Sequence, residues 1–121
     1  MDDKQQVKNL VNTIYDAIEE KKGNNITIIK FTPELTTICD YFVIADADND
    51  RQIKAIMDNV ETKVKQSLNL KPLHVEGEMT AQWIVLDYLD VIVHLFQPEA
   101  REFYALEKLW ADAQFYNDKL Q

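Results

Sequence analysis

Residues 83–96 read WIVLDYLDVIVHLF, and this stretch decides the fold. Residues 83–88 and 91–96 are rich in β-branched and aromatic side chains, which is the composition of β-strands. Only Leu89 and Asp90 separate the two runs, a gap that is typical of a hairpin. The stretch therefore predicts two neighbouring antiparallel strands.

The chain before the hairpin predicts a strand, a helix and a further strand. Residues 41–45 (YFVIA) form a continuous apolar run, as in a central strand that is covered on both faces. A polar turn follows, whose residues 48–50 include a capping residue, and apolar side chains over 53–68 then have the spacing of one helix face. Residues 73–76 favour the next strand, so the unit implies a parallel pair with a right-handed crossover.

Two helices and a first strand complete the pattern. Residues 7–18 place apolar side chains on one helix face, and residues 26–31 (ITIIKF) favour a strand. Residues 98–99 (PE) begin a last helix, because proline and an acidic residue suit a first helical turn. We therefore predict one α/β (α+β) domain over residues 1–121, a mixed β-sheet of about five strands flanked by helices, with 114–121 as a candidate flexible tail.

Composition limits the class of protein. The chain has 121 residues, 46% of them hydrophobic, which argues against a disordered, fibrous or disulfide-built protein. No apolar run approaches the roughly 18 residues of a membrane span, and the polar N-terminus lacks the apolar core of a signal peptide. The single cysteine, Cys39, fits a reducing compartment. We therefore expect a cytoplasmic protein that does not contact a membrane.

The formal net charge of −8 bears on the kind of partner. Nucleic-acid binding relies on lysine and arginine to neutralise phosphates, so broad contact with RNA is not expected. An acidic protein is better suited to a basic protein surface, because opposite fields steer the encounter. The alternative is that the acidity only aids solubility, and the charge alone leaves both explanations open.

Three alternating carboxylates, Asp46, Asp48 and Asp50, follow a predicted strand and suggest a metal site. A calcium loop needs glycine at its sixth position and glutamate at its twelfth, where this chain has Arg51 and Met57. A metal-dependent nucleotidyltransferase would need a glycine-rich phosphate cradle and a third carboxylate in register. We interpret the three residues as a turn that caps the next helix.

The histidines and the cysteine do not form a recognisable catalytic or metal-binding motif. His74 and His94 lack the spacing of a zinc site, and His94 alternates with apolar residues as a satisfied, half-buried histidine would. Cys39 has no neighbouring cation that would activate it and is interpreted as a packing residue. With two glycines the chain cannot form a glycine-rich phosphate loop. We predict no catalytic residue, no metal ligand and no cofactor.

The strand at 83–88 offers the best candidate for a binding surface. Alternation places Trp83, Val85 and Asp87 on one face of the sheet, and Ile84, Leu86 and Tyr88 on the other. Tryptophan is enriched at binding hot spots, and an aromatic anchor beside a carboxylate suits a basic protein partner. The alternative, with Trp83 in the core and Asp87 shaping the hairpin, has equal support from the sequence.

Three separate blocks of the sequence resemble the ribosomal silencing factor family, also called Iojap-like. They lie within residues 40–56 (DYFVIA, then DRQIKAI), 76–94 (EG, then WIVLDY and DVIVH) and 101–113 (REFYALEKLWADA). Their order and spacing are compatible with the family over nearly the whole chain. Two positions depart from it: the usual small residues after the first block's strand are Asp46 and Ala47, and the usual hairpin glycine is Leu89, which resists a positive φ.

The resemblance implies a binding protein rather than an enzyme, with a nucleotidyltransferase-like fold that lacks the catalytic residues. Members of the family bind the large ribosomal subunit through ribosomal protein uL14. Binding there blocks joining of the small subunit and represses translation under nutrient limitation. Members are often homodimers when free.

Matched residue by residue, the resemblance implies a partner-binding block that consists of Trp83, Leu86, Asp87, Tyr88 and Leu89. Trp83 is then expected as the apolar anchor, and Asp87 as the partner of a lysine or arginine. Packing or dimer contacts are expected from four residues of the last helix: Phe103, Tyr104, Leu106 and Trp110.

Two alternative functions stay open. A biogenesis factor of the large subunit would use the same contact surface on immature particles. A metal-dependent nucleotidyltransferase would use Asp46, Asp48 and Asp50, although the motifs above argue against it.

Overall fold

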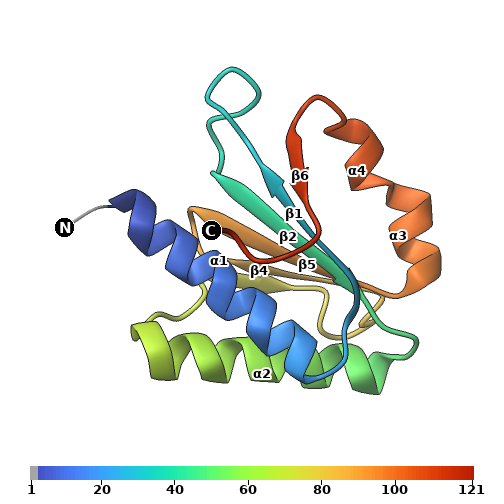
Figure 1. Ribbon diagram of the computed structural model, residues 1–121. Helices are drawn as coiled ribbons and strands as arrows, with labels where there is room; N and C mark the ends of the chain where they lie inside the picture. Colours follow the sequence, from blue (N-terminus) through green and yellow to red (C-terminus); the bar gives the residue numbers. More distant parts are fainter. Residues whose placement is uncertain (1–2) are drawn as a thin grey trace.

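The computed structural model describes residues 3–121, and it shows a six-stranded sheet with helices on both faces (Figure 1). Met1 and Asp2 of the predicted domain lie outside the described residues. The elements in chain order are α1 (Asp3–Glu20), β1 (Asn24–Lys30), β2 (Tyr41–Asp46), α2 (Asp50–Leu68), β3 (His74–Glu76), β4 (Trp83–Asp87), β5 (Val91–Phe96), α3 (Pro98–Tyr104), α4 (Leu106–Leu109) and β6 (Gln114–Tyr116). The predicted mixed α+β fold is confirmed, with one strand more than expected.

The strands lie in the order β3-β4-β5-β2-β1-β6. β2 and β5 are parallel, and the other neighbouring pairs are antiparallel. The predicted hairpin of β4 and β5 is confirmed. The predicted parallel pair is corrected: the parallel neighbour of β2 is β5, and β3 lies at the edge, separated from β2 by β4 and β5. The physical reason is burial, because β5 is buried on both faces and suits the centre, whereas β3 is three residues long and its two ends are exposed.

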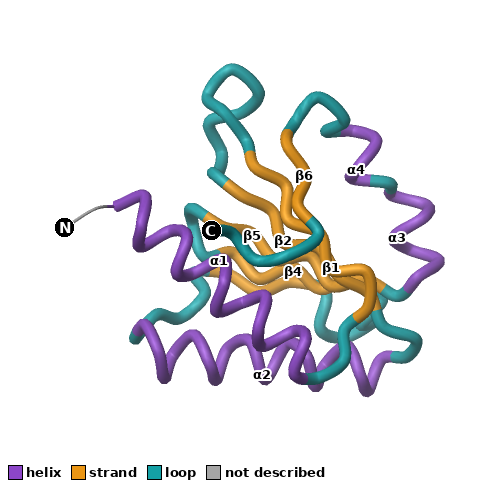
Figure 2. Tube along the Cα trace, in the orientation of Figure 1, coloured by secondary structure: helices purple, strands orange, loops and turns teal. Residues whose placement is uncertain are grey.

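The two faces of the sheet are covered by different helices. α1 and α2 pack together on one face, where they bury Ile14, Ile18, Ile56 and Val60 against the strands. α3 and α4 lie over part of the opposite face, above a smaller apolar cluster that includes Ile44 and other residues of β1, β2 and β5. Loops join these elements at the two ends of the sheet (Figure 2). The face that carries α3 is the less fully covered of the two, and the candidate site lies on it.

The long helix α2 is capped at both ends by asparagine. The side chain of Asn49 accepts a hydrogen bond from the backbone N–H of Gln52 at 2.9 Å, as one of the predicted capping residues. Asn69 adopts a left-handed conformation at the other end, and its N–H bonds the carbonyl of Lys65. Within residues 3–121, no helix is both long and apolar enough to cross a membrane.

The C-terminal part differs from the prediction of one last helix that extends to Trp110. Ala105 has a φ of 47°, a left-handed conformation that ends α3 and turns the chain into the short α4. Residues 114–121, the candidate flexible tail, include β6, which pairs with β1. The backbone of Leu120 bonds the side chain of Asn12 twice, at 2.8 and 2.9 Å. The tail in this structure thus lies against α1 and the edge of the sheet.

Candidate protein-binding site

β4 presents its side chains alternately to the two faces of the sheet. Ile84 and Leu86 are fully buried toward α1 and α2, while Trp83, Val85 and Asp87 are half-buried on the opposite face. This arrangement confirms the predicted alternation. Trp83 and Asp87 therefore share one face of the sheet, so that one partner could contact both side chains.

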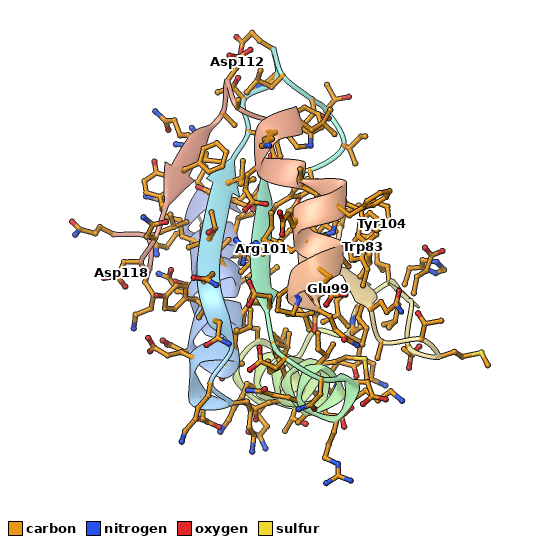
Figure 3. All side chains as sticks on the ribbon, turned by 90° about the vertical axis from the view of Figure 1, so that its right-hand side faces the viewer. Trp83, Glu99, Arg101, Tyr104, Asp112 and Asp118 are labelled. Carbon is orange, nitrogen blue, oxygen red and sulfur yellow. The ribbon has the colours of Figure 1, made fainter. Side chains whose placement is uncertain are left out.

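Trp83 is held between aromatic rings rather than lying free on the surface. Its ring stacks on Phe96 at a centroid distance of 5.0 Å and contacts Tyr104 at 4.5 Å. Figure 3 shows Trp83 and Tyr104 together on one side of α3. The indole N–H of Trp83 donates a hydrogen bond to Nδ1 of His94 at 3.1 Å. Trp83 thus combines the two alternatives drawn from the sequence, because it packs on the sheet and keeps part of its ring exposed.

His94 is more deeply buried than the half-buried, satisfied histidine that the sequence predicted. It is 6% exposed, and burial lowers its pKa to about 3, so the imidazole is neutral near pH 7. Its Nε2 is buried without a hydrogen-bond partner in the described part of the chain. Its ring also contacts Phe42 at 4.4 Å. Sequence reasoning missed its pairing with Trp83, because that pairing depends on the register of β4 and β5.

The hairpin after β4 is a tight turn with leucine in a strained position. Leu89 has a φ of 75°, and the N–H of Asp90 donates a hydrogen bond to the carbonyl of Tyr88 at 3.0 Å. A hydrogen bond between residues i and i+2 defines a γ-turn. Asp87 supports the turn, because its Oδ1 accepts the N–H of Leu89 at 2.8 Å. The Leu89 side chain is 60% exposed. The chain therefore keeps the tight hairpin without its usual glycine and places an apolar side chain at the tip.

Carboxylates surround the hairpin and repel one another. Burial, and then the charges of Asp40 and Asp3, raise the pKa of Asp90. Burial is also the main cause that raises the pKa of the Cys39 thiol to about 12, with further contributions from Asp40, Asp87 and Asp90. Cys39 is therefore an inert packing residue, as predicted. The local potential at this end of the sheet favours a cationic partner.

Two residues of the predicted binding block face the helices rather than the solvent. Leu86 is fully buried, and Tyr88 is 6% exposed. Burial raises the pKa of the Tyr88 hydroxyl, which has no hydrogen-bond partner within residues 3–121. Of the five residues in the block, the structure therefore brings Trp83, Asp87 and Leu89 to positions with exposed or half-exposed side chains.

The four aromatic and apolar residues of the predicted last helix divide into two pairs. Leu106 is 9% exposed, and Trp110 is half-buried against Phe31 at 4.9 Å, so both pack on the sheet. Phe103 is 80% exposed and Tyr104 is 49% exposed, with their rings 5.1 Å apart. Phe103 and Tyr104 thus extend the aromatic surface of Trp83 outward along α3.

An ion-pair network that sequence reasoning missed fastens α3 to the sheet. Arg101 donates to Asp46 at 2.9 Å and to Glu107 at 3.1 Å, and it bonds the carbonyl of Asn25 at 2.7 Å. Arg101 and Asp46 are 11% and 7% exposed in their side chains. Figure 3 shows Arg101 on the side of α3 that faces β1 and β2. The Asp46 carboxylate is therefore occupied by a cation of the chain itself.

The carboxylates considered as a metal site do not gather in the structure. Across residues 3–121, no three histidine, cysteine or acidic side chains lie close enough to hold a metal ion. Asp46 is bound by Arg101, and the turn at Asp48 and Asp50 leads through Asn49 into α2. The arrangement supports interpreting this turn as a cap.

Comparison with known proteins gives a consistent result. The family model described as "Ribosomal silencing factor during starvation" matches residues 4–121. Ribosomal silencing factor RsfS of Haemophilus influenzae is 36% identical over 84% of this chain and 98% of its own length, and that of Halalkalibacterium halodurans is 32% identical over 86% and 87%. A crystal structure from Chromobacterium violaceum superposes with a TM-score of 0.80 at 30% identity, covering 85% of this chain and 84% of the other. A mouse protein, "Mitochondrial assembly of ribosomal large subunit protein 1", is 30% identical over 87% of this chain and 46% of its own.

Proposed function

Because the chain belongs to the ribosomal silencing factor family, we propose that it binds the large ribosomal subunit through ribosomal protein uL14 and blocks joining of the small subunit. This action would repress translation under nutrient limitation. The family name describes a regulator of the ribosome. We accordingly propose a binding protein that is not an enzyme and needs no cofactor.

The observation that supports this proposal best is the set of exposed or half-exposed side chains along β4 and its hairpin, Trp83, Asp87 and Leu89, here called the β4 surface. It combines a rigid aromatic ring, a half-buried carboxylate and an exposed apolar side chain at the hairpin tip. Interface hot spots are typically such aromatic anchors flanked by polar groups. The acidic surroundings suit a basic ribosomal protein, so Asp87 is the proposed partner of a lysine or arginine.

Leu86 and Tyr88 are proposed to contribute from beneath the surface. Both are buried toward α1 and α2, where they hold β4 against the core. Their part in binding would be to keep the strand rigid, since a preorganised strand loses less freedom on association.

The net charge of −8 supports a protein partner with little direct RNA contact. We also propose that the protein acts in the cytoplasm, where ribosomal subunits of a bacterial cell are found, and that it does not contact a membrane. These proposals follow from the family and the charge rather than from any feature of the β4 surface.

Co-sedimentation with separated ribosomal subunits tests the proposal. We expect the protein to pellet with the large subunit alone, and Trp83→Ala to weaken that binding by about 2 kcal/mol, roughly 30-fold in Kd, which is the scale of a hot spot. Phe115→Ala is the matched control, because Phe115 is also a partly exposed aromatic residue but lies on β6, at the opposite part of the sheet.

Circular dichroism would first establish that both variants are folded. A folded Trp83→Ala protein that binds as tightly as wild type would refute the role of Trp83. Failure of wild type to bind the large subunit at low salt, in a sample shown to be monomeric, would refute the partner. If binding is found, light scattering of mixed subunits would show whether joining is blocked.

A biogenesis role on the large subunit is the second candidate, and the name of the mouse relative favours it. The two roles would share one contact surface, so binding experiments cannot distinguish them. Sucrose-gradient profiles of cells that lack the protein can. Accumulated precursors of the large subunit would support biogenesis, whereas normal subunits with excess joining under starvation would support silencing.

A homodimer of the free protein is proposed from the exposed rings of Phe103 and Tyr104, which lie beside Trp83. If the dimer covers the β4 surface, dimerisation and ribosome binding compete. Sedimentation velocity at micromolar concentration should then show a species of twice the chain's 14.1 kDa. A single species of the monomer mass would contradict the dimer.

A further inference from the structure

We propose that His94 is a positioning residue, which fixes the orientation of the Trp83 indole on the β4 surface. The inference rests on the proposed function, because it concerns how the anchor is presented to the partner. In the pairing of β4 with β5, Val85 lies opposite His94 and Trp83 lies opposite Phe96. Trp83 and His94 are therefore diagonal neighbours on one face, a separation that long side chains can bridge.

The hydrogen bond between the two side chains defines the tautomer of His94. Indole nitrogen can only donate, so Nδ1 of His94, 3.1 Å from Nε1 of Trp83, must be an unprotonated acceptor. Burial lowers the pKa of His94 to about 3, which keeps the ring neutral at physiological pH. The single ring proton is then on Nε2.

A structural role alone does not explain a histidine at this position. The ring lies among the aromatic rings of Phe42 and Phe96, where an apolar side chain would pack without a polar atom. Nε2 is a buried donor without a partner within residues 3–121, which is unfavourable for the fold. The property that histidine has here, and leucine or phenylalanine lacks, is an acceptor for the indole N–H.

The acceptor selects one of two indole orientations. The stacking contacts with Phe96 and Tyr104 involve ring faces, and a ring turned over by half a rotation can keep similar contacts. The bond to His94 favours the orientation with the N–H pointing inward. Nitrogen is the only polar atom of the tryptophan side chain, so the exposed part of Trp83 is hydrocarbon. A partner that docks there leaves no indole donor unpaired.

The test compares two substitutions with the same heavy-atom branching, His94→Asn and His94→Leu. The asparagine amide oxygen can accept a hydrogen bond close to the position of Nδ1, whereas leucine has no acceptor. Leucine is the larger and more apolar of the two, so packing alone would favour His94→Leu. Tighter binding by His94→Asn would therefore report the acceptor rather than packing. Circular dichroism and thermal unfolding establish that each variant is folded.

Two readouts are expected to move together. In ¹H–¹⁵N spectra, His94→Leu shifts the indole N–H resonance of Trp83 and speeds its solvent exchange about tenfold, the effect of losing one hydrogen bond, while the resonance of Trp110 stays in place. The Kd for large subunits rises by about the same factor in His94→Leu and by less than about threefold in His94→Asn. In a Trp83→Ala background, His94→Leu should produce no further loss.

Several results would overturn the inference without affecting the proposed function. Equal binding of His94→Leu and wild type, with Trp83→Ala still defective, would leave Trp83 as the anchor and remove His94 from its presentation. An additional loss from His94→Leu in the Trp83→Ala background would show that His94 acts by another route. Long-range ¹H–¹⁵N spectra of the wild-type protein provide a check that needs no variant, because a proton on Nδ1 would exclude the proposed bond.

Discussion

At the scale of single residues, Leu89 combines strain with exposure. A left-handed backbone costs an L-residue about 1–2 kcal/mol, and glycine avoids this at an entropic cost of about 0.5–1 kcal/mol. Leu89 has a φ of 75° and is 60% exposed, so its side chain gains little from packing in the free protein. Backbone strain that is not offset by packing in the free protein indicates a role in binding, which is consistent with the position of Leu89 on the β4 surface.

Leu89→Gly is therefore expected to stabilise the protein while weakening its binding to large subunits. The free energy of unfolding should rise by about 0.5–1 kcal/mol, as measured by urea denaturation, because the strain is relieved. Leu73→Gly is the control, since Leu73 is 69% exposed but has no positive φ, and it should destabilise the protein slightly. A decrease on Leu89→Gly equal to that control would show that the turn is not strained.

At the scale of elements, Arg101 provides the ionic attachment of α3 to the sheet. No residue of α3 itself is buried, whereas Arg101 connects it to Asp46 of β2, to Asn25 of β1 and to Glu107 of α4. Tyr104 of the same helix contacts Trp83. The ion-pair network lies on the side of α3 opposite to Tyr104, and by fixing the helix it also keeps Tyr104 against Trp83.

Arg101→Met should lower the free energy of unfolding by about 3 kcal/mol, because it leaves the buried Asp46 carboxylate without its cation. Lys108→Met, on the exposed side of α4, removes a positive charge from the same region and should change stability by no more than about 0.5 kcal/mol. Urea denaturation of the two variants beside wild type is the measurement. Similar values for both would mean that the network contributes no more than surface charge does.

The elements also show what the sequence could predict. The hairpin, α2 and the alternation of β4 were predictable, because strand and helix periodicity is local and the burial follows from it. The neighbour of β2, the end of α3 at Ala105 and the strand β6 were not, since each depends on distant contacts. In the candidate site, the shared face of Trp83 and Asp87 was predictable from one strand's pattern, whereas the contacts of His94 and Arg101 cross between strands and give no local signal.

At the scale of the whole molecule, the net charge of −8 should raise the rate of association with a basic partner. Raising the ionic strength from 50 to 500 mM should lower the association rate with large subunits about tenfold, because screening shortens the range of the field. The dissociation rate, recorded in the same surface-binding experiment, should change less, since it depends on the short-range contacts at Trp83 and Asp87, which salt screens weakly. An association rate that does not respond to salt would mean that charge plays no part in the encounter.

The sheet ends at β6, a strand of three residues that is held by β1 and, through Leu120, by Asn12 of α1. A three-residue edge strand at a chain end is held by few contacts, so residues 114–121 should open while the rest stays folded. Each opening leaves backbone N–H and C=O groups of β1 unpaired over residues 28–30. At this edge, resistance to edge-to-edge aggregation during storage therefore depends on a few contacts of the last residues, because the tail can open while the core stays folded.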